Sequence, residues 1–453
     1  MAGFISFLEN RVMPVAGRLA DQKHLQAIRD GIILTLPLLI IGSLFLIIGF
    51  LPIPGYNEFM SGLFGENWLT KLLYPVNATF DIMALIVSFG VAYSLAERYK
   101  VDPISAGAIS VAAFLLATPY TTLFTPEGAS QAVEVGGVIP VSLMGSKGLF
   151  VAMLLAILAT EIYRKIIQRN IVFRMPSGVP PAVSRSFVAL IPAFVVLLVV
   201  WLLRILIENT PFESIHNIVS DLLAGPLGTL GNSLFGGIIA VLFVHVLWAV
   251  GLHGAAIVDG VMGPIWLSLM DQNRAVFQAD PTAELPNIIT KQFFDLWVYA
   301  GGSGATLALV VLMLTVAKSK QLKSIGRLGI GPGLFNINEP VIFGMPVVMN
   351  PLLIIPFIIS PVVLVVITYV AMSLGWVAKP NGVAVPWTTP LLFSGYLATG
   401  GKISGVVLQV FNFIVALLIY YPFFRLWDQK KLSEEQSEAA SQQAGGTDRS
   451  MRM

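Results

Sequence analysis

Residues 331–351 read GPGLFNINEPVIFGMPVVMNP and place one carboxylate, Glu339, beside Asn338. The thirty-nine residues that follow, 340–378, carry no charge. A charge at the edge of so apolar a tract is costly unless it has a partner or a function. The flanking glycines and prolines argue against a plain spanning helix, and irregular backbone inside a membrane survives only where protein buries it or where it lines a wet cavity. We therefore expect Glu339 to lie at the centre of a binding site.

The whole chain shares this apolar character. Of its 453 residues, 56% are hydrophobic and only 11% are charged, with a mean hydropathy of +0.81. Soluble domains carry about 25% charged residues, so the composition predicts an all-α polytopic membrane protein. The net charge of +2 is uninformative about nucleic acid, and no basic arm with interleaved aromatic residues appears, so we expect no nucleic-acid partner. The chain has no cysteine, which excludes disulfides, thiolate metal sites and covalent chemistry on its own sulfur.

Uncharged segments of membrane-spanning length recur along the chain. They predict about ten transmembrane helices, with spans over 31–51, 82–96, 103–126, 148–160, 186–203, 222–258, 296–317, 352–374 and 403–424. Two further apolar segments are too short or too rich in proline to cross as plain helices, so we expect two re-entrant hairpins, at 260–270 and 380–401. The polar, glycine-rich residues 127–147 predict an extramembrane loop or a short hairpin.

Charge placement predicts the orientation. Basic clusters follow several spans, at 164–174, 318–327 and 425–431, and the positive-inside rule places them, and both termini, in the cytoplasm. Residues 1–30 have the spacing of an amphipathic helix at the inner membrane surface. The mixed connector 204–221 suggests a division into an N-terminal half, 1–210, and a C-terminal half, 211–431. Residues 432–453 are rich in serine, glutamine and glutamate, so we expect a disordered cytoplasmic tail.

Asn338 and Glu339 form the first candidate site. Their donors and acceptors suit sugar hydroxyls, and the carboxylate is a candidate general base. The structural alternative is that Glu339 caps a helix, or pairs with Lys323 or Arg327 at the membrane edge.

His253 is the second candidate, because it lies between Gly251 and Gly254 at the end of a long uncharged run. A loop of this kind suits ligand contact, although a histidine bonded to backbone inside the bundle is the alternative. His245, in the middle of a span, is expected to be a packed side chain. Asp259 either pairs with a nearby base or caps a helix. We predict no metal site and no cofactor, since neither histidine has an acidic cluster beside it.

Trp387, in the sequence AVPWTTP, is the third candidate. Its ring is a platform for the apolar face of a sugar, and an interfacial tryptophan is the alternative. The glycine-rich GGSGAT at 301–306 is not a phosphate loop, because no GK[ST] follows it, so we expect its small residues to serve close packing.

Taken together, these features resemble a known family, the membrane-spanning IIC component of the bacterial phosphoenolpyruvate-dependent sugar phosphotransferase system. The lactose/cellobiose/diacetylchitobiose branch is the most similar. The resemblance extends over nearly the whole chain and is carried by LHGAA at 252–256, GGSGATL at 301–307, NINEPVIFG at 336–344, NP at 350–351 and PWT at 386–388.

The resemblance implies a homodimeric permease in the bacterial cytoplasmic membrane. Its N-terminal half would be the dimer scaffold, and its C-terminal half would bind a β-linked disaccharide and move as a rigid body. Glu339 and His253 would face the C6 hydroxyl that is phosphorylated, Asn338 would bind sugar and Trp387 would stack on it. Since this chain has no cysteine, a separate IIB protein would bring the phosphoryl group on a phosphocysteine, and this chain would not itself carry it.

Two other functions stay open from the residues alone. One is an ion-coupled secondary sugar transporter, with Glu339 as a proton or sodium site. The other is a membrane-embedded enzyme without transport, which finds little support because no nucleophile–base pair or nucleotide loop is visible. Cellobiose, lactose and diacetylchitobiose are not distinguished.

Overall fold

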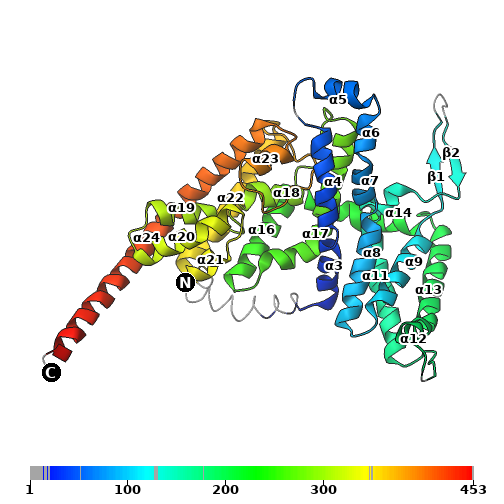
Figure 1. Cartoon of the computed structure of the whole chain (residues 1–453), viewed down its shortest axis with the longest axis horizontal. Helices are drawn as coiled ribbons and strands as arrows, with labels where there is room; N and C mark the ends of the chain where they lie inside the picture. The colour runs from blue at the N-terminus through cyan, green and yellow to red at the C-terminus, as the bar shows by residue number, and fades with distance from the viewer. Residues whose placement is uncertain are drawn as a thin grey trace.

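The chain forms an almost entirely helical bundle with one small β-hairpin (Figure 1). The computed structural model describes Pro14, Arg18 and residues 21–51, 53–126, 131–176, 178–345, 347 and 350–450. The amphipathic helix predicted over residues 1–30 therefore lies mostly outside the described residues. From Lys23 the chain is helical, and the first candidate span, Lys23–Gly49, begins at this residue.

The first half contains eleven α-helices, one 3-10 helix and the hairpin within its described residues. In chain order these are α3 (Lys23–Ile33), α4 (Leu36–Gly49), α5 (Tyr56–Phe64), α6 (Trp68–Leu72), α7 (Tyr74–Phe80), α8 (Met83–Arg98), α9 (Pro103–Ala117), β1 (Thr121–Phe124), β2 (Val133–Gly136), α10 (Val141–Met144), η2 (Ser146–Gly148), α11 (Leu149–Gln168), α12 (Pro181–Val188) and α13 (Leu190–Glu208). The hairpin pairs Thr121 with Gly136 and Phe124 with Val133, so β2 lies within the polar segment predicted as a loop or hairpin, 127–147, whereas β1 precedes that segment.

The second half is more broken. It contains α14 (Ile215–Val219), η3 (Ser220–Ala224), α15 (Gly225–Gly231), α16 (Leu234–Ala249), α17 (Gly254–Ala279), α18 (Lys291–Phe293), η4 (Phe294–Val298), α19 (Leu307–Thr315), α20 (Lys320–Leu334), α21 (Glu339–Gly344), α22 (Pro351–Ser373), α23 (Phe393–Ala398) and α24 (Ile403–Ser450). Short helices and turns thus alternate with long helices through most of this half.

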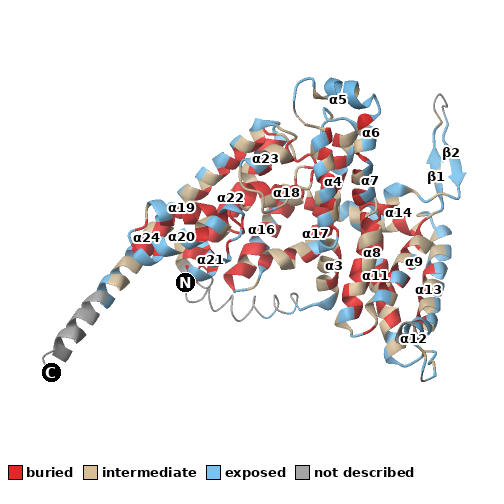
Figure 2. Cartoon of the chain, viewed as in Figure 1, coloured by how far each residue is buried: buried red, intermediate tan, exposed pale blue. Residues whose placement is uncertain are grey.

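Five helical segments of the described chain are long and apolar enough to cross a membrane. They are Lys23–Gly49, Tyr74–Arg98, Val183–Glu208, Leu352–Ser373 and Ile403–Glu438, and a sixth arises if Ile215–Gly231 and Leu234–Ala249, which meet at 80°, form one span. Large apolar side chains remain exposed on these helices, such as Phe194 and Leu206 on α13 (Figure 2). Such faces suit a lipid environment or a partner chain. The structure therefore agrees with an α-helical multi-pass membrane protein, without confirming ten spans.

Three predicted segments differ from the structure. The span predicted over 296–317 is helical only at α19 and at the short η4, because the GGSGA segment between them turns with positive φ, 80° at Gly301 and 86° at Gly304. The span predicted over 103–126 ends at Ala117 and continues as a strand. The hairpin predicted at 260–270 is the middle of α17, which accommodates Pro264 without breaking.

The C-terminal tail was predicted to be disordered, but α24 continues as a helix to Ser450. Its first turns beyond the apolar part are anchored: Asp428 accepts hydrogen bonds from the backbone of Lys318 and Ser319, and Glu435 accepts one of 2.6 Å from the Ser319 hydroxyl. Alanine, glutamate and glutamine are also good helix formers, so local propensity and these bonds together favour helix over disorder.

Contacts between the two halves are polar as well as apolar. Arg274 on α17, almost fully buried, donates to Asp81 at 3.0 Å and to Asp271 at 2.6 Å, so it links α17 to the loop after α7. The Ala384 amide donates to the Ser43 hydroxyl at 2.7 Å. The larger core cluster correspondingly includes residues from both halves, whereas the smaller one contains only residues between Ala84 and Val219.

Candidate functional site

One cavity of about 690 Å³ is lined by all four residues predicted to form the site: His253, Asn338, Glu339 and Trp387. They come from three separate parts of the second half, namely the start of α17, the start of α21 and the irregular segment before α23. Small-molecule sites typically have volumes of ~300–1,000 Å³. The cavity is therefore large enough for a disaccharide, and the structure brings together residues up to 134 positions apart.

The turn before α21 is built on Asn336, which the sequence analysis did not single out. Its backbone is left-handed, with φ of 62°, a conformation that asparagine tolerates better than most residues. Its side-chain oxygen accepts a hydrogen bond from the Gly301 amide at 2.7 Å, and its side-chain nitrogen donates to the Trp387 carbonyl at 2.6 Å. Asn336 therefore connects three cavity-lining segments by hydrogen bonds. The only feature of the sequence that indicated this role was its position two residues before Asn338.

Asn338 is buried and fixed by one hydrogen bond, from its side-chain nitrogen to the Ser303 carbonyl at 2.8 Å. Its amide oxygen has no partner within the described chain. A Cβ added at Gly302 would lie 2.6 Å from the Asn338 side chain, so only glycine permits this approach. The predicted packing role of the GGSGAT segment is thus confirmed, although its backbone is a turn and not a helix.

Glu339 is the first residue of α21, and its side chain is exposed to the cavity. Within the described chain its carboxylate makes no hydrogen bond and no ion pair. Neither structural alternative holds there, because Glu339 caps no helix and pairs with neither Lys323 nor Arg327. A carboxylate that faces a cavity without a protein partner is available to a ligand.

His253 is the N-cap of α17, and its Nδ1 atom accepts a hydrogen bond from the Ala256 amide at 3.1 Å. Because Nδ1 accepts, the neutral imidazole carries its proton on Nε2. The ring also packs against Trp248, with the centroids 4.6 Å apart. His253 is therefore held in one orientation, with Nε2–H as its free donor. His245 is a packed side chain as predicted, since its ring is buried and its Nδ1 contacts the Val241 carbonyl at 2.7 Å.

The Trp387 ring lines the cavity and is 50% exposed. Asn336 holds its backbone, so the indole is presented on a braced segment. Four more aromatic residues line the cavity, namely Trp248, Trp266, Phe294 and Tyr299. The sequence analysis did not identify them, because aromatic residues in so apolar a chain carry no signal that distinguishes a ligand contact from core packing.

Three charged residues also line the cavity. Lys291 donates to Asp259 and to Asp295, each at 3.0 Å. The sequence left Asp259 between a pairing and a capping role, and the structure shows the pairing. Lys291 and Asp295 were missed, although their spacing of four places both on one face of a helical turn. With Glu339 the cavity contains three carboxylates and one ammonium group, so its net charge is negative.

No group of three or more histidine and acidic side chains is arranged to hold a metal within the described parts of the chain. The cavity instead combines aromatic faces, a fixed imidazole donor, an amide oxygen and an unpaired carboxylate. Such a combination suits a neutral, hydroxyl-rich ligand.

The comparisons with known proteins agree on one family. Residues 29–361 match the family described as "Phosphotransferase system, EIIC". The chain is 70% identical to the PTS system cellobiose-specific EIIC component of Geobacillus stearothermophilus, over all of both chains, and 64% identical to the Lichenan permease IIC component of Bacillus subtilis (strain 168), over 97% of each. The crystal structure of the transporter ChbC, the IIC component from the N,N'-diacetylchitobiose-specific phosphotransferase system, superposes with a TM-score of 0.92 at 62% identity, covering 95% of this chain and 99% of that one.

Proposed function

The chain belongs to the EIIC family of the phosphotransferase system, and from that premise we propose that it binds a β-linked disaccharide of the cellobiose type, carries it across the membrane and presents its C6 hydroxyl for phosphorylation. The relatives named for cellobiose and diacetylchitobiose support this sugar class. The observation that carries the proposal is that His253, Asn338, Glu339 and Trp387 line one cavity.

The fixed histidine tautomer assigns the roles in proton transfer. Since the Nδ1 atom of His253 accepts from the Ala256 amide, Nε2–H donates to the sugar oxygen and orients it. A neutral imidazole in this tautomer has no free nitrogen to accept the hydroxyl proton. Glu339, whose carboxylate has no partner within the described chain, is therefore the general base.

The transfer step then balances as follows. The C6 hydroxyl gives its proton to the Glu339 carboxylate as its oxygen forms a bond to the phosphorus. The phosphorus–sulfur bond of the phosphocysteine on a separate IIB protein breaks, and the cysteine leaves as a thiolate. Catalysis by this chain consists mainly of positioning the acceptor.

Sugar binding would rest on aromatic faces and few polar contacts. Trp387, half exposed, offers its ring to the apolar face of a glucose unit, and the buried Asn338 offers its amide oxygen to a hydroxyl. Each sugar hydroxyl that leaves water needs such a replacement partner, or binding costs free energy.

The charge balance of the cavity favours substrate over product. Lys291 is already neutralised by Asp259 and Asp295, so it does not act as a phosphate clamp. A phosphoryl dianion on the C6 oxygen is repelled by each carboxylate of the cavity that no cation neutralises, by ~2 kcal/mol per unit of charge at ~8 Å and more at shorter range, for an effective dielectric constant of ~20. The cavity thus accepts a neutral sugar and repels the phosphorylated one towards release.

The finer architecture is part of the same proposal. We place about ten transmembrane helices and one re-entrant segment, at 380–401, in a homodimer, with residues 1–210 as scaffold and 211–431 as the moving half. Both termini lie in the cytoplasm, since the positive-inside rule favours that side for the basic cluster at 318–327 that precedes α21. The exposed apolar face of α13 suits the dimer contact.

The test is uptake of labelled cellobiose by proteoliposomes that contain the phosphoryl donor proteins. Glu339→Gln keeps the size of the side chain but removes the base, so it should bind cellobiose within about tenfold of wild type and lose phosphorylating uptake by 100-fold or more. Lys323→Gln, on the neighbouring helix and outside the cavity, is the control and should keep full uptake.

Full uptake by the Glu339→Gln variant would refute the general-base role. If wild-type uptake instead proceeded without phosphoenolpyruvate and collapsed with the proton gradient, the chain would be an ion-coupled transporter, and the phosphorylation proposal would be wrong.

A further inference from the structure

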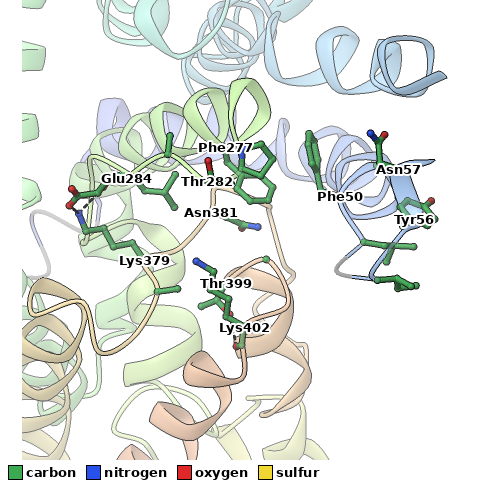
Figure 3. Close-up of a pocket in the computed structure, with 18 of the residues that line it drawn as sticks. Phe50, Tyr56, Asn57, Phe277, Thr282, Glu284, Lys379, Asn381, Thr399 and Lys402 are labelled. Atoms are coloured by element: carbon green, nitrogen blue, oxygen red, sulfur yellow. Dashed lines mark hydrogen bonds and ion pairs between the residues drawn. The ribbon is translucent and has the colours of Figure 1, made fainter. Parts of the chain in front are cut away.

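A second cavity, of about 780 Å³, lies between the two halves of the chain and shares no lining residue with the first (Figure 3). Phe50, Tyr56 and Asn57 line one side, and Phe277 and Asn381 line the other. The Phe50 and Phe277 rings lie 5.1 Å apart at 60°, so the two walls meet through an aromatic contact.

The two cavities lie at opposite ends of α17. His253 precedes the first turn of this helix and lines the first cavity, whereas Phe277 in its last turn lines the second. At 1.5 Å per residue, twenty-four residues of helix separate them by about 36 Å. The hydrocarbon core of a bilayer is ~30 Å thick, so the two cavities are far enough apart to open on opposite sides of the membrane. With the proposed orientation, the second cavity opens on the outer face.

Asn381 offers this second cavity an unused hydrogen-bond donor. Its side chain is only 3% exposed, and its oxygen is used locally, accepting from the Val383 amide at 3.1 Å. Its side-chain nitrogen has no partner within the described chain and faces the cavity (Figure 3). Buried amide groups are normally hydrogen-bonded, and an unused donor at a cavity wall indicates an acceptor that arrives from outside.

The chemistry of the walls indicates a neutral carbohydrate. The charged lining residues are balanced, two acidic (Glu58, Glu284) and two basic (Lys379, Lys402), and Lys379 is already paired with Glu284 at 2.9 Å. An anion or a cation therefore gains little there. Aromatic rings beside amides and hydroxyls suit the alternating apolar faces and hydroxyl edges of a sugar.

We propose that this second cavity is an outer capture site, which binds the β-linked disaccharide before it reaches the cavity of His253 and Glu339. The inference rests on the proposed sugar-permease function and adds a site to it. Because its walls come from both halves, sugar bound there contacts the scaffold and the moving half together. Movement of one half against the other changes the spacing of these walls and hands the sugar on.

The experiment separates capture from transfer. Asn381→Ser keeps a side-chain oxygen for the Val383 amide but removes the free donor. Tyr56→Leu keeps apolar bulk but removes the ring face. Cellobiose uptake is measured in proteoliposomes that contain the phosphoryl donors, and cellobiose phosphorylation is measured with the same proteins in detergent, where the first cavity is reached without crossing a membrane. Tyr120→Leu, an exposed tyrosine outside both cavities, is the matched control.

Each of the two variants should raise the KM for uptake by about threefold to tenfold, the loss of one or two neutral contacts, and leave the KM for phosphorylation in detergent unchanged. The control variant should change neither. Unchanged uptake KM in both variants, with an active wild type, would overturn the capture site alone. Equal losses in both assays would assign these residues to folding and would also overturn it. A wild type that takes up cellobiose without phosphorylating it would count against the proposed function instead.

Discussion

Asn336→Ala is the most informative substitution outside the residues that contact the reacting hydroxyl. Asn336 is 7% exposed and accepts from the Gly301 amide at 2.7 Å, while its nitrogen donates to the Trp387 carbonyl at 2.6 Å. Alanine removes both bonds and must still adopt φ of 62°. The change therefore removes the hydrogen bonds that hold the cavity-lining segments together, without substituting any side chain that is proposed to contact the sugar.

The magnitude follows from two contributions. Leaving the buried Gly301 amide without an acceptor costs about 1–3 kcal/mol. A left-handed alanine costs roughly a further 1–2 kcal/mol, which Asn336→Gly avoids. We expect Asn336→Ala to lower the free energy of unfolding by about 2–5 kcal/mol, and Asn336→Gly to recover roughly 1–2 kcal/mol of that loss.

Chemical unfolding in detergent measures these differences, and calorimetric titration with cellobiose measures the effect on the site. The affinity of both variants should fall by about tenfold, because Trp387 loses the bond that fixes its segment. If both variants unfolded within ~0.5 kcal/mol of wild type and bound cellobiose equally well, Asn336 would not organise the cavity, and the reasoning would fail.

Three further predictions concern the charged groups. Arg274→Met leaves the buried Asp271 without its partner, so unfolding experiments in detergent should show a loss of about 3–5 kcal/mol; a change below 1 kcal/mol would show that the network contributes little. Cellobiose 6-phosphate should bind at least roughly tenfold more weakly than cellobiose in calorimetry, and Asp295→Asn should reduce this difference in affinity. Equal affinities for the two sugars in wild type would contradict the repulsion of the phosphorylated sugar by the negatively charged cavity. Asp428→Ala removes the acceptor for two backbone amides and should lower the free energy of unfolding by about 1–3 kcal/mol, more than Glu435→Ala, whose backbone partners are solvent-exposed; the reverse order would be evidence against this anchoring.

The site was largely predictable from the sequence because its side chains stand out chemically. Glu339 is a carboxylate at the edge of a long uncharged tract, and His253 lies between glycines. Both signals depend only on the cost of placing polar groups in an apolar region, which composition reveals. The structure places both at one cavity, together with Trp387.

The bracing of the site was not predictable in the same way. Asn336 reads as one more polar residue of a motif, and its role depends on a left-handed backbone and on partners 35 and 51 positions away. Lys291 similarly reads as a charge between two apolar segments. Only the fold reveals that it lies between Asp259 and Asp295 inside the cavity.

The predicted boundaries of apolar segments were wrong where charged residues form ion pairs, or glycines make close contacts, with distant parts of the chain. The short apolar segment predicted as a hairpin at 260–270 is flanked by Asp259 and Asp271, and both carboxylates pair with basic residues, Lys291 and Arg274, so α17 continues past them. The predicted span at 296–317 failed for a different reason. Its Gly304 packs against Phe357 so closely that a Cβ would lie 2.3 Å from the ring, and the backbone turns there.

A structure of the protein with bound cellobiose would decide whether Glu339 and His253 hold the phosphoryl acceptor. We expect the C6 oxygen of one glucose unit within about 2.6–3.2 Å of both the Glu339 carboxylate and the Nε2 atom of His253, with the sugar against the Trp387 ring. Sugar bound in this cavity with its C6 oxygen away from both side chains, while the protein remains active in phosphorylation, would contradict the assignment.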